Sequence, residues 1–140
     1  MALIECVPNF SEGRDAQVLE QIAQSIRAVD GVKLLDIESG HATNRTVFTF
    51  VGEPEPVIEA AFQAIKRASE LIDMSHHSGE HPRMGATDVC PLIPIRDISM
   101  EEVVILAHRL GERVGRELGI PGYYYEYAAT SSERRNLADV

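Results

Sequence analysis

Strand-like and helix-like segments alternate along this 140-residue chain in one particular order. The patterns follow one another as strand, helix, two strands, helix, strand, helix and strand. The first six are the elements of the split βαβ arrangement. We therefore expect an α+β, ferredoxin-like sandwich, in which a mixed, mostly antiparallel sheet carries its helices on one face. The strands are expected at residues 3–10, 32–39, 45–52, 89–95 and 122–127.

Capping residues and prolines mark where the helices begin and end. Asp15 is a suitable N-cap for the first helix, and Gly31 is expected to end it. Pro54 opens the second helix, and Ser99 with Glu102 forms a capping box before the third. Three apolar stripes at helical spacing are expected in the core: Val18, Leu19, Ile22, Ala23 and Ile26; Val57, Ile58, Ala61, Phe62, Ile65, Ala68 and Ile72; and Val103, Leu106, Leu110, Val114 and Leu118.

The composition predicts one soluble domain over residues 1–140. Hydrophobic residues make up 44% and charged residues 25%, with a net charge of -9 and no run rich in lysine and arginine. Such a chain is poorly suited to bind nucleic acid or an anionic membrane, and no apolar run is long enough to span a bilayer. Two cysteines without a CxxC spacing indicate neither a disulfide framework nor a thiolate zinc site, so we expect a cytoplasmic protein.

The most unusual stretch is HHSGEHPRMGATDVCP, residues 76–91, which has three histidines within six positions. His76, His77 and His81 could bind a metal together with an acidic neighbour. However, glycine and proline disfavour the continuous helix that this spacing needs, and the sequence has no HExxH motif. Alternatively, His81 could exchange a proton with a substrate amine near neutral pH while Arg83 binds a carboxylate. The third interpretation is a solvated loop with no chemical role.

Polar residues also gather in the expected hairpin DIESGHATNRT and in the segment after the first strand. In a split βαβ order, the hairpin and the stretch 76–91 can meet at one end of the sheet, so a joint site is possible. Such residues could contact a substrate. They could equally serve as turn residues, edge charges and hydrogen-bond partners of the backbone. The six residues are Asn9, Ser11, Asp36, Glu38, Asn44 and Arg45.

Three stretches carry a resemblance to a known family: ECVPNFSEGR, TNRTVFTFVG and LIDMSHHSGEHPRMGATDVCPLIPI. They closely resemble the N-terminal subdomain of glutamate formiminotransferase, the folate enzyme of histidine breakdown, which in animals is fused to a cyclodeaminase. The resemblance covers nearly the whole chain. It implies transfer of a formimino group between N-formimino-L-glutamate and tetrahydrofolate, with tetrahydrofolate as co-substrate and no metal. The alternative is a noncatalytic folate-binding or protein-interaction module derived from that subdomain.

The resemblance also implies roles for individual residues. His81, within GEHPRMGA, matches the catalytic histidine of the family. Asp36 and Glu38 would face the positive charge of the amidine, although the family has Asp at the second position, and Glu38 is longer by one methylene. Arg45 and Arg83 would bind the carboxylates of glutamate or folate. The remaining residues expected to contact substrate are Asn9, Ser11, Asn44 and Gly85.

The family's transferase domain is longer than this chain and holds folate in a cleft between two similar subdomains. The resemblance therefore implies that a complementary C-terminal subdomain is missing from this chain, and three alternatives stay open: a fragment of a longer protein, a chain whose other half a separate polypeptide supplies, or a binding module that has lost catalysis. Without that partner, apolar surface would stay uncovered, and uncovered apolar patches drive association. We accordingly expect a homodimer or a tendency to self-associate.

Overall fold

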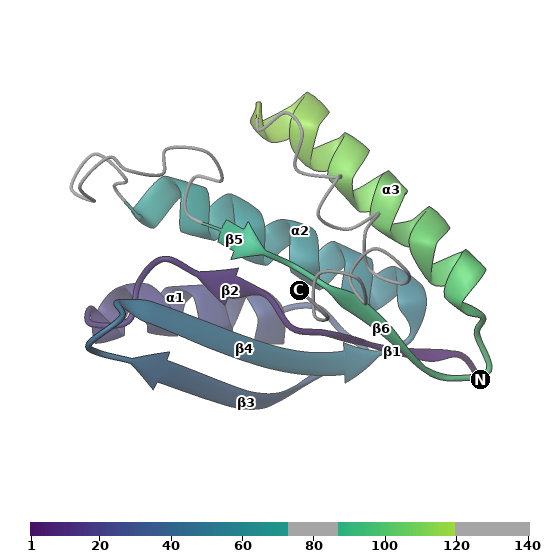
Figure 1. Cartoon of the computed structure of the whole chain (residues 1–140), viewed down its shortest axis with the longest axis horizontal. Coiled ribbons are helices and arrows are strands. Elements are labelled where there is room, and N and C mark those ends of the chain that lie inside the picture. The colour runs from purple at the N-terminus through teal and green to yellow at the C-terminus, as the bar shows by residue number, and fades with distance from the viewer. Residues whose placement is uncertain (73–86, 120–140) are drawn as a thin grey trace, which may run out of the picture.

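The computed structural model describes residues 1–72 and 87–119, and these form an α+β sandwich (Figure 1). The predicted strand at 122–127 lies outside the described residues. In chain order the elements are β1 (Leu3–Cys6), β2 (Asn9–Phe10), α1 (Ala16–Arg27), β3 (Val32–Gly40), β4 (Arg45–Gly52), α2 (Pro54–Leu71), β5 (Thr87–Val89), β6 (Leu92–Arg96) and α3 (Met100–Leu118).

The described strands form one sheet whose central strand is β4. One side of β4 pairs with β3, and the other side pairs first with β2 and then with β1. The outer sides of β2 and β1 pair with β5 and β6. Because β1 and β2 lie end to end, as do β5 and β6, the sheet has the four-stranded order of a ferredoxin-like fold. The predicted fold class is confirmed, and every pairing between the described strands is antiparallel.

Prolines divide two of the predicted strands. The pattern at 3–10 forms β1 and β2, and the pattern at 89–95 forms β5 and β6. The two breaks are neighbours, since the backbone N–H of Val7 donates to the carbonyl oxygen of Pro91 at 3.1 Å. Pro8 and Pro91 have no N–H to give to a ladder, so regular pairing stops at each of them. The predicted alternation nevertheless continues, because Ile4, Cys6, Pro8 and Phe10 are all buried.

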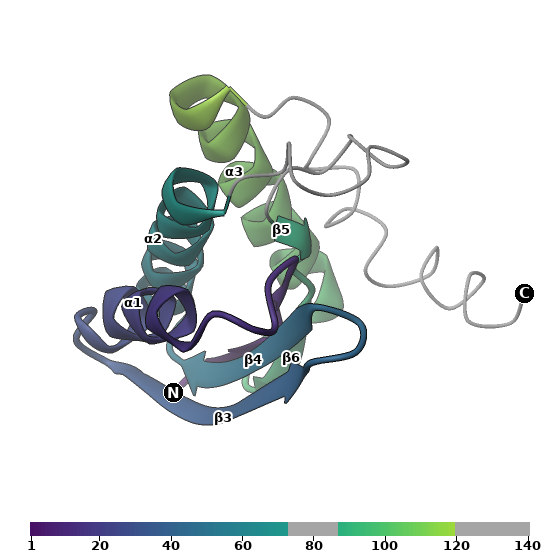
Figure 2. The ribbon, with the colours of Figure 1, turned by 90° about the vertical axis from the view of Figure 1, so that its left-hand side faces the viewer.

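Among the described elements, α1, α2 and α3 cover one face of the sheet and none covers the other, which we call the open face (Figure 2). Asp15 caps α1 as predicted, and Ser99 and Glu102 form the predicted capping box of α3. The predicted end of α1 at Gly31 is wrong: the helix ends at Arg27, and Gly31 adopts a φ of +90° in the turn to β3. Glycine adopts that conformation at no steric cost. None of the described helices combines the length and the apolar character that a membrane span needs.

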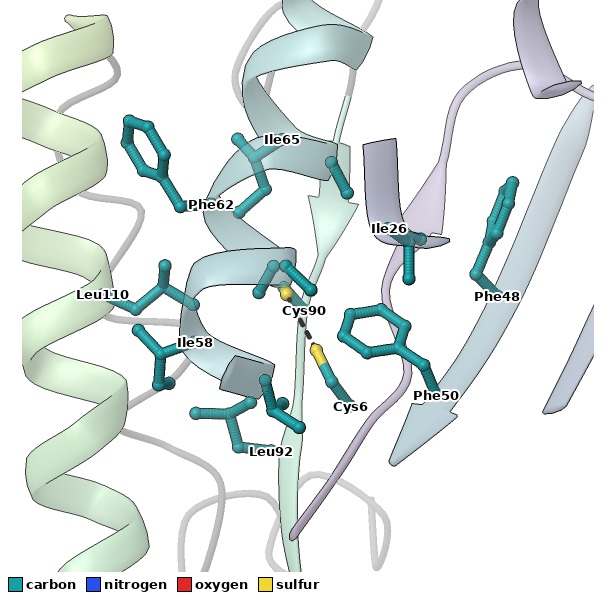
Figure 3. Packing of buried hydrophobic residues seen from close by; sticks show 14 of the residues in the cluster. Cys6, Ile26, Phe48, Phe50, Ile58, Phe62, Ile65, Cys90, Leu92 and Leu110 are labelled. Atoms are coloured by element: carbon teal, nitrogen blue, oxygen red, sulfur yellow. Dashed lines mark hydrogen bonds between the residues drawn. The ribbon is translucent and has the colours of Figure 1, made fainter. Parts of the chain in front are cut away.

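The hydrophobic core lies between the sheet and the helices (Figure 3). The predicted stripes of α2 and α3 are buried, apart from the partly buried Leu118, whereas Val18 and Leu19 of α1 are only partly buried. Cys6 and Cys90 are free thiols in the core and point toward each other, with 3.4 Å between their Sγ atoms. Burial is the main cause that raises the pKa of the Cys6 thiol. The Cys6 thiol is therefore kept neutral, and both thiols are shielded from solvent.

A bulge in β3 changes which side chains face the helices. Leu34 pairs with the buried Phe50, but the next residue to pair is Asp36, which lies opposite Thr49. Leu35 is the extra residue, and its side chain is 52% exposed. Regular alternation from Leu34 would turn Asp36 and Glu38 toward the core, where an unpaired carboxylate is costly. The bulge turns both toward the open face instead.

Candidate active site on the open face of the sheet

The open face of the sheet gathers polar side chains that are far apart in the sequence. Along β4, Thr46, Phe48 and Phe50 are fully buried, so the residues between them face away from the helices. Cross-strand pairing extends this face over β3, β1, β2 and β6. Its described members include Leu3, Glu5, Asn9, Lys33, Asp36, Glu38, Arg45, Val47, Thr49, Val51 and Ile93.

Asp36 and Glu38 form an acidic pair on this face. Both side chains are exposed, and two residues along one face of a strand are separated by about 7 Å. Glu38 lies opposite Val47, which pairs on its other side with Asn9. The pairing thus places two carboxylates and an amide from two segments on one surface. A cationic group could bind there.

Arg45 lies on the same face at the end nearest the hairpin. It is the first residue of β4, its side chain is exposed, and it pairs with Gly40. Its guanidinium therefore lies toward one edge of the surface that carries the acidic pair. Ser11 follows β2 at this end of the sheet and is half-buried. The hairpin and the segment after β2 therefore lie at the same end of the sheet, whereas most of the stretch 76–91, with which the hairpin was expected to form a joint site, lies outside the described residues.

The hairpin between β3 and β4 is joined directly to the segment before α1. The side-chain oxygen of Asn44 accepts a hydrogen bond from the backbone N–H of Gly13 at 2.8 Å. Asn44 has a φ of 54°, a left-handed conformation that asparagine tolerates better than most residues. The observed use of its side chain is therefore to hold the hairpin. The proposed contact of Asn44 with substrate remains a prediction.

The segment that contains HHSGEHPRMGA has described residues at both of its ends. Ile72 is buried at the C-cap of α2, at the same end of the molecule as the hairpin (Figure 1). Thr87 begins β5 and pairs with Phe10, which in turn pairs with Thr46. The described residue that follows this segment, Thr87, therefore lies near the hairpin end of the sheet.

Several predictions fall on that segment and lie outside the described residues. These are the catalytic role of His81, the substrate contacts of Arg83 and Gly85, and the alternative of a metal bound by His76 and His77. Within residues 1–72 and 87–119, no three histidine, cysteine or acidic side chains come together in a group that could hold a metal ion.

The sequence interpretation missed four residues that shape this end of the sheet. The backbone and side chains of Glu12, Gly13, Arg14 and Thr46 connect the segment before α1 to the hairpin. The glycine was the available signal, because NFSEGRD places it two residues before the helix cap Asp15, and glycine permits a close backbone approach. The partner of that approach is a hairpin some thirty residues away, and no local pattern identifies it.

Two hollows among the described residues lie elsewhere, along α3. One has a volume of about 610 Å³ and is bordered by Val104, Ile105, His108, Arg109 and Glu112. The other, of about 350 Å³, is bordered by residues around the N-terminal turn of α3, among them Ile98 and Leu106. Neither is bordered by a residue that the sequence analysis selected as a candidate site residue. The candidate site is therefore the open face and not these hollows.

Comparison with known proteins shows the family of this chain. The sequence profile of the formiminotransferase domain, N-terminal subdomain, matches residues 3–140, and the chain belongs to this family. It is 52% identical over 138 residues to the glutamate formimidoyltransferase of Streptococcus pyogenes, covering 99% of this chain and 46% of that protein. It is 56% identical over 135 residues to the formimidoyltransferase-cyclodeaminase of Gallus gallus, covering 96% of this chain and 25% of that protein.

A more distant relative is the formiminotransferase cyclodeaminase-like protein of Arabidopsis thaliana. It is 28% identical over 142 residues, which cover 94% of this chain and 48% of the plant protein. The chain thus spans less than half the length of each of these relatives. The matched region in each case corresponds to one part of a longer protein.

Proposed function

We propose that this chain is the half of a glutamate formimidoyltransferase that carries the catalytic histidine. The reaction is transfer of the formimino group between N-formimino-L-glutamate and tetrahydrofolate, in histidine degradation. The observation that carries the proposal is the match over almost the entire chain to proteins named for this activity. The surface that gathers Asp36, Glu38, Asn9 and Arg45 supports it, because the substrate has both a cationic amidine and carboxylates.

In the proposed mechanism His81 moves the proton. The N5 amine of tetrahydrofolate attacks the amidine carbon of formiminoglutamate and must lose a proton as the new C–N bond forms. The glutamate nitrogen must gain a proton as its bond to that carbon breaks. An imidazole with a pKa near the working pH can accept the first proton and donate the second. A single histidine therefore suffices for both halves of the transfer.

The acidic pair on β3 has an electrostatic role in this proposal. The amidine carries positive charge, which Asp36 or Glu38 can compensate. Both carboxylates are exposed on the open face, so a bound partner or substrate would have to exclude water before their charges act at full strength. Arg45 and Arg83 are the proposed partners of the substrate carboxylates.

The open face also supports a complementary C-terminal part as partner. Between its charged residues lie Val47 and Val51, which are half-buried on a sheet face that the described helices do not cover (Figure 2). A second layer on this face would bury them and enclose the acidic pair. The relatives are long enough to contain such a part, because this chain covers only 46% of the streptococcal enzyme.

We further propose that the isolated chain forms a homodimer or self-associates, since the same uncovered face is available to a second copy. Sedimentation over a wide concentration range tests this, and a monomer throughout would refute it. We also propose a cytoplasmic location, because the two buried cysteines are free thiols and a reducing compartment keeps thiols reduced.

The transfer itself is tested by measuring 5-formiminotetrahydrofolate formed from formiminoglutamate. The chain is assayed alone and together with the C-terminal part of a relative such as the streptococcal enzyme. We expect little turnover from the chain alone and robust turnover in the mixture. Tetrahydrofolate binding without turnover, even with a competent partner, would favour the noncatalytic folate-binding module.

A further inference from the structure

The segment before α1 and the β3–β4 hairpin are joined by hydrogen bonds from three donor residues. The N–H of Gly13 donates to the side-chain oxygen of Asn44 at 2.8 Å. The hydroxyl of Thr46 donates to the carbonyl oxygen of Glu12 at 2.5 Å. The Nε of Arg14 donates to the carbonyl oxygen of His41 at 2.8 Å. We call residues 12–14 with 40–46 the latch.

Close packing makes this junction specific for glycine. A Cβ added to Gly13 would lie 2.5 Å from the backbone nitrogen of Arg45 and 2.5 Å from the carbonyl oxygen of Gly40. Both contacts are with backbone, which cannot move aside as a flexible side chain could. Gly13 therefore packs directly against the residue pair that closes the hairpin, Gly40 and Arg45.

The latch is itself fixed to the helix layer. The carboxylate of Glu12 accepts hydrogen bonds from the backbone N–H groups of Arg14 and Asp15, at 3.0 and 2.9 Å. Asp15 then caps α1 by accepting from the N–H groups of Gln17 and Val18. A continuous series of contacts thus connects the N-terminus of α1 to the hairpin. The hairpin is therefore held by the segment that caps α1 as well as by its own turn.

We propose that the latch positions Arg45 and Glu38 on the open face for the substrate, so that Asn44, Gly13 and Thr46 are positioning residues of the transferase. The inference rests on the proposed function. Thr46 is fully buried on the helix side of β4, so it can influence the substrate only through the backbone that it holds. Arg45 is its chain neighbour on the opposite side of the strand. A loosened latch would therefore misplace the guanidinium that we expect to bind a carboxylate.

The test uses pairs of variants in the chain combined with its complementary C-terminal part. Asn44→Gly keeps the left-handed backbone but removes the acceptor, whereas Asn44→Asp keeps an acceptor. Thr46→Val removes the hydroxyl at similar volume, whereas Thr46→Ser keeps it. We expect Asn44→Gly and Thr46→Val each to raise the KM for formiminoglutamate by about 5- to 10-fold with little change in kcat, as expected for the loss of one positioning hydrogen bond. The Asp and Ser variants should stay near the unaltered protein.

Three outcomes would overturn the inference. One is a lower melting temperature with unchanged KM in both disruptive variants, which means that the latch is only structural. Another is a raised KM for Asn44→Gly but not for Thr46→Val, which means that Asn44 contacts the substrate itself. The third is an unchanged amide exchange rate at Gly13 in Asn44→Gly. This last measurement does not depend on enzymatic activity. It therefore tests the latch even if the unaltered protein proves inactive and the proposed function is refuted.

Discussion

The two faces of β4 have opposite surroundings although their residues alternate along a single strand. Thr46, Phe48 and Phe50 are fully buried beneath the helices, whereas Val47 and Thr49 between them are only half-buried. Phe48 packs edge to face on Phe10, with 5.3 Å between the ring centroids and 87° between the ring planes. The helix face therefore supplies the stability of the fold. Side chains on the open face do not pack in this core, so charged groups can lie there at a modest cost in folding free energy.

The largest expected effect is on rate and concerns the histidine-rich segment. Changing His81 to Gln removes the group that titrates near neutral pH and should lower kcat by about 10²- to 10⁴-fold in the complemented enzyme. Because we expect His81 in a loop, the free energy of unfolding should change by less than about 0.5 kcal/mol. Steady-state kinetics and thermal melts measure the two effects. His76→Gln and His77→Gln are the controls, and equal losses in all three, reversed by zinc, would indicate a metal instead.

A second substitution tests the helix face directly. Phe48→Ala should lower the free energy of unfolding by about 3–5 kcal/mol, because it removes a fully buried aromatic ring and leaves a cavity. Its neighbour Thr49→Ala, on the open face, should cost less than about 1 kcal/mol. Urea unfolding of the two variants gives the comparison. Similar losses would mean that the open face is packed as tightly as the core, contrary to the fold described.

The acidic pair offers a smaller effect on activity. Glu38→Gln keeps the size of the side chain but removes its charge, and kcat/KM should fall by about 10-fold if the carboxylate faces the amidine. Glu38→Asp introduces the residue that we expect of the family and should retain most activity. Neither variant should move the melting temperature, because Glu38 is exposed. Full activity of Glu38→Gln would mean that Glu38 does not compensate the amidine charge, and Asp36 would remain as the candidate for that role.

The smallest effect concerns an ion pair between α2 and α3. Hydrogen bonds from Arg113, and next from Gln63, lower the pKa of Glu59. A lowered pKa stabilises the folded state above the ordinary glutamate pKa, and this contribution is lost as the pH falls through the folded-state pKa. The side chain of Glu59 is 42% exposed, so the effect should stay below about 1 kcal/mol. Denaturation of Glu59→Gln should differ from the unaltered chain near neutrality and converge with it in acid.

The exposed carboxylate Glu112 provides the control for that experiment, since Glu112→Gln removes the same charge from the face of α3. A difference in the stability of Glu59→Gln that persists unchanged into acid would show that lost packing, and not the ion pair, causes it.

Local patterns were enough to predict most of the fold. The helix caps at Asp15 and Ser99 and the apolar stripes depend on contacts within a few residues, and the structure has them as predicted. The order of the elements then left few topologies open, because antiparallel hairpins and short connections restrict which strands can be neighbours. The resemblance to the family predicts a catalytic role for His81, which lies outside the described residues and stays a prediction.

Two features of the site required the tertiary structure. The bulge at Leu35 decides that Asp36 and Glu38 face outward, and a strand pattern read in regular alternation would have turned them inward. The latch between Gly13 and Asn44 joins residues that have α1 and β3 between them in the chain. Both depend on where a partner strand or loop lies in space. A single sequence encodes the periodicity of its own segments, but register and close approach are settled only when those segments pack together.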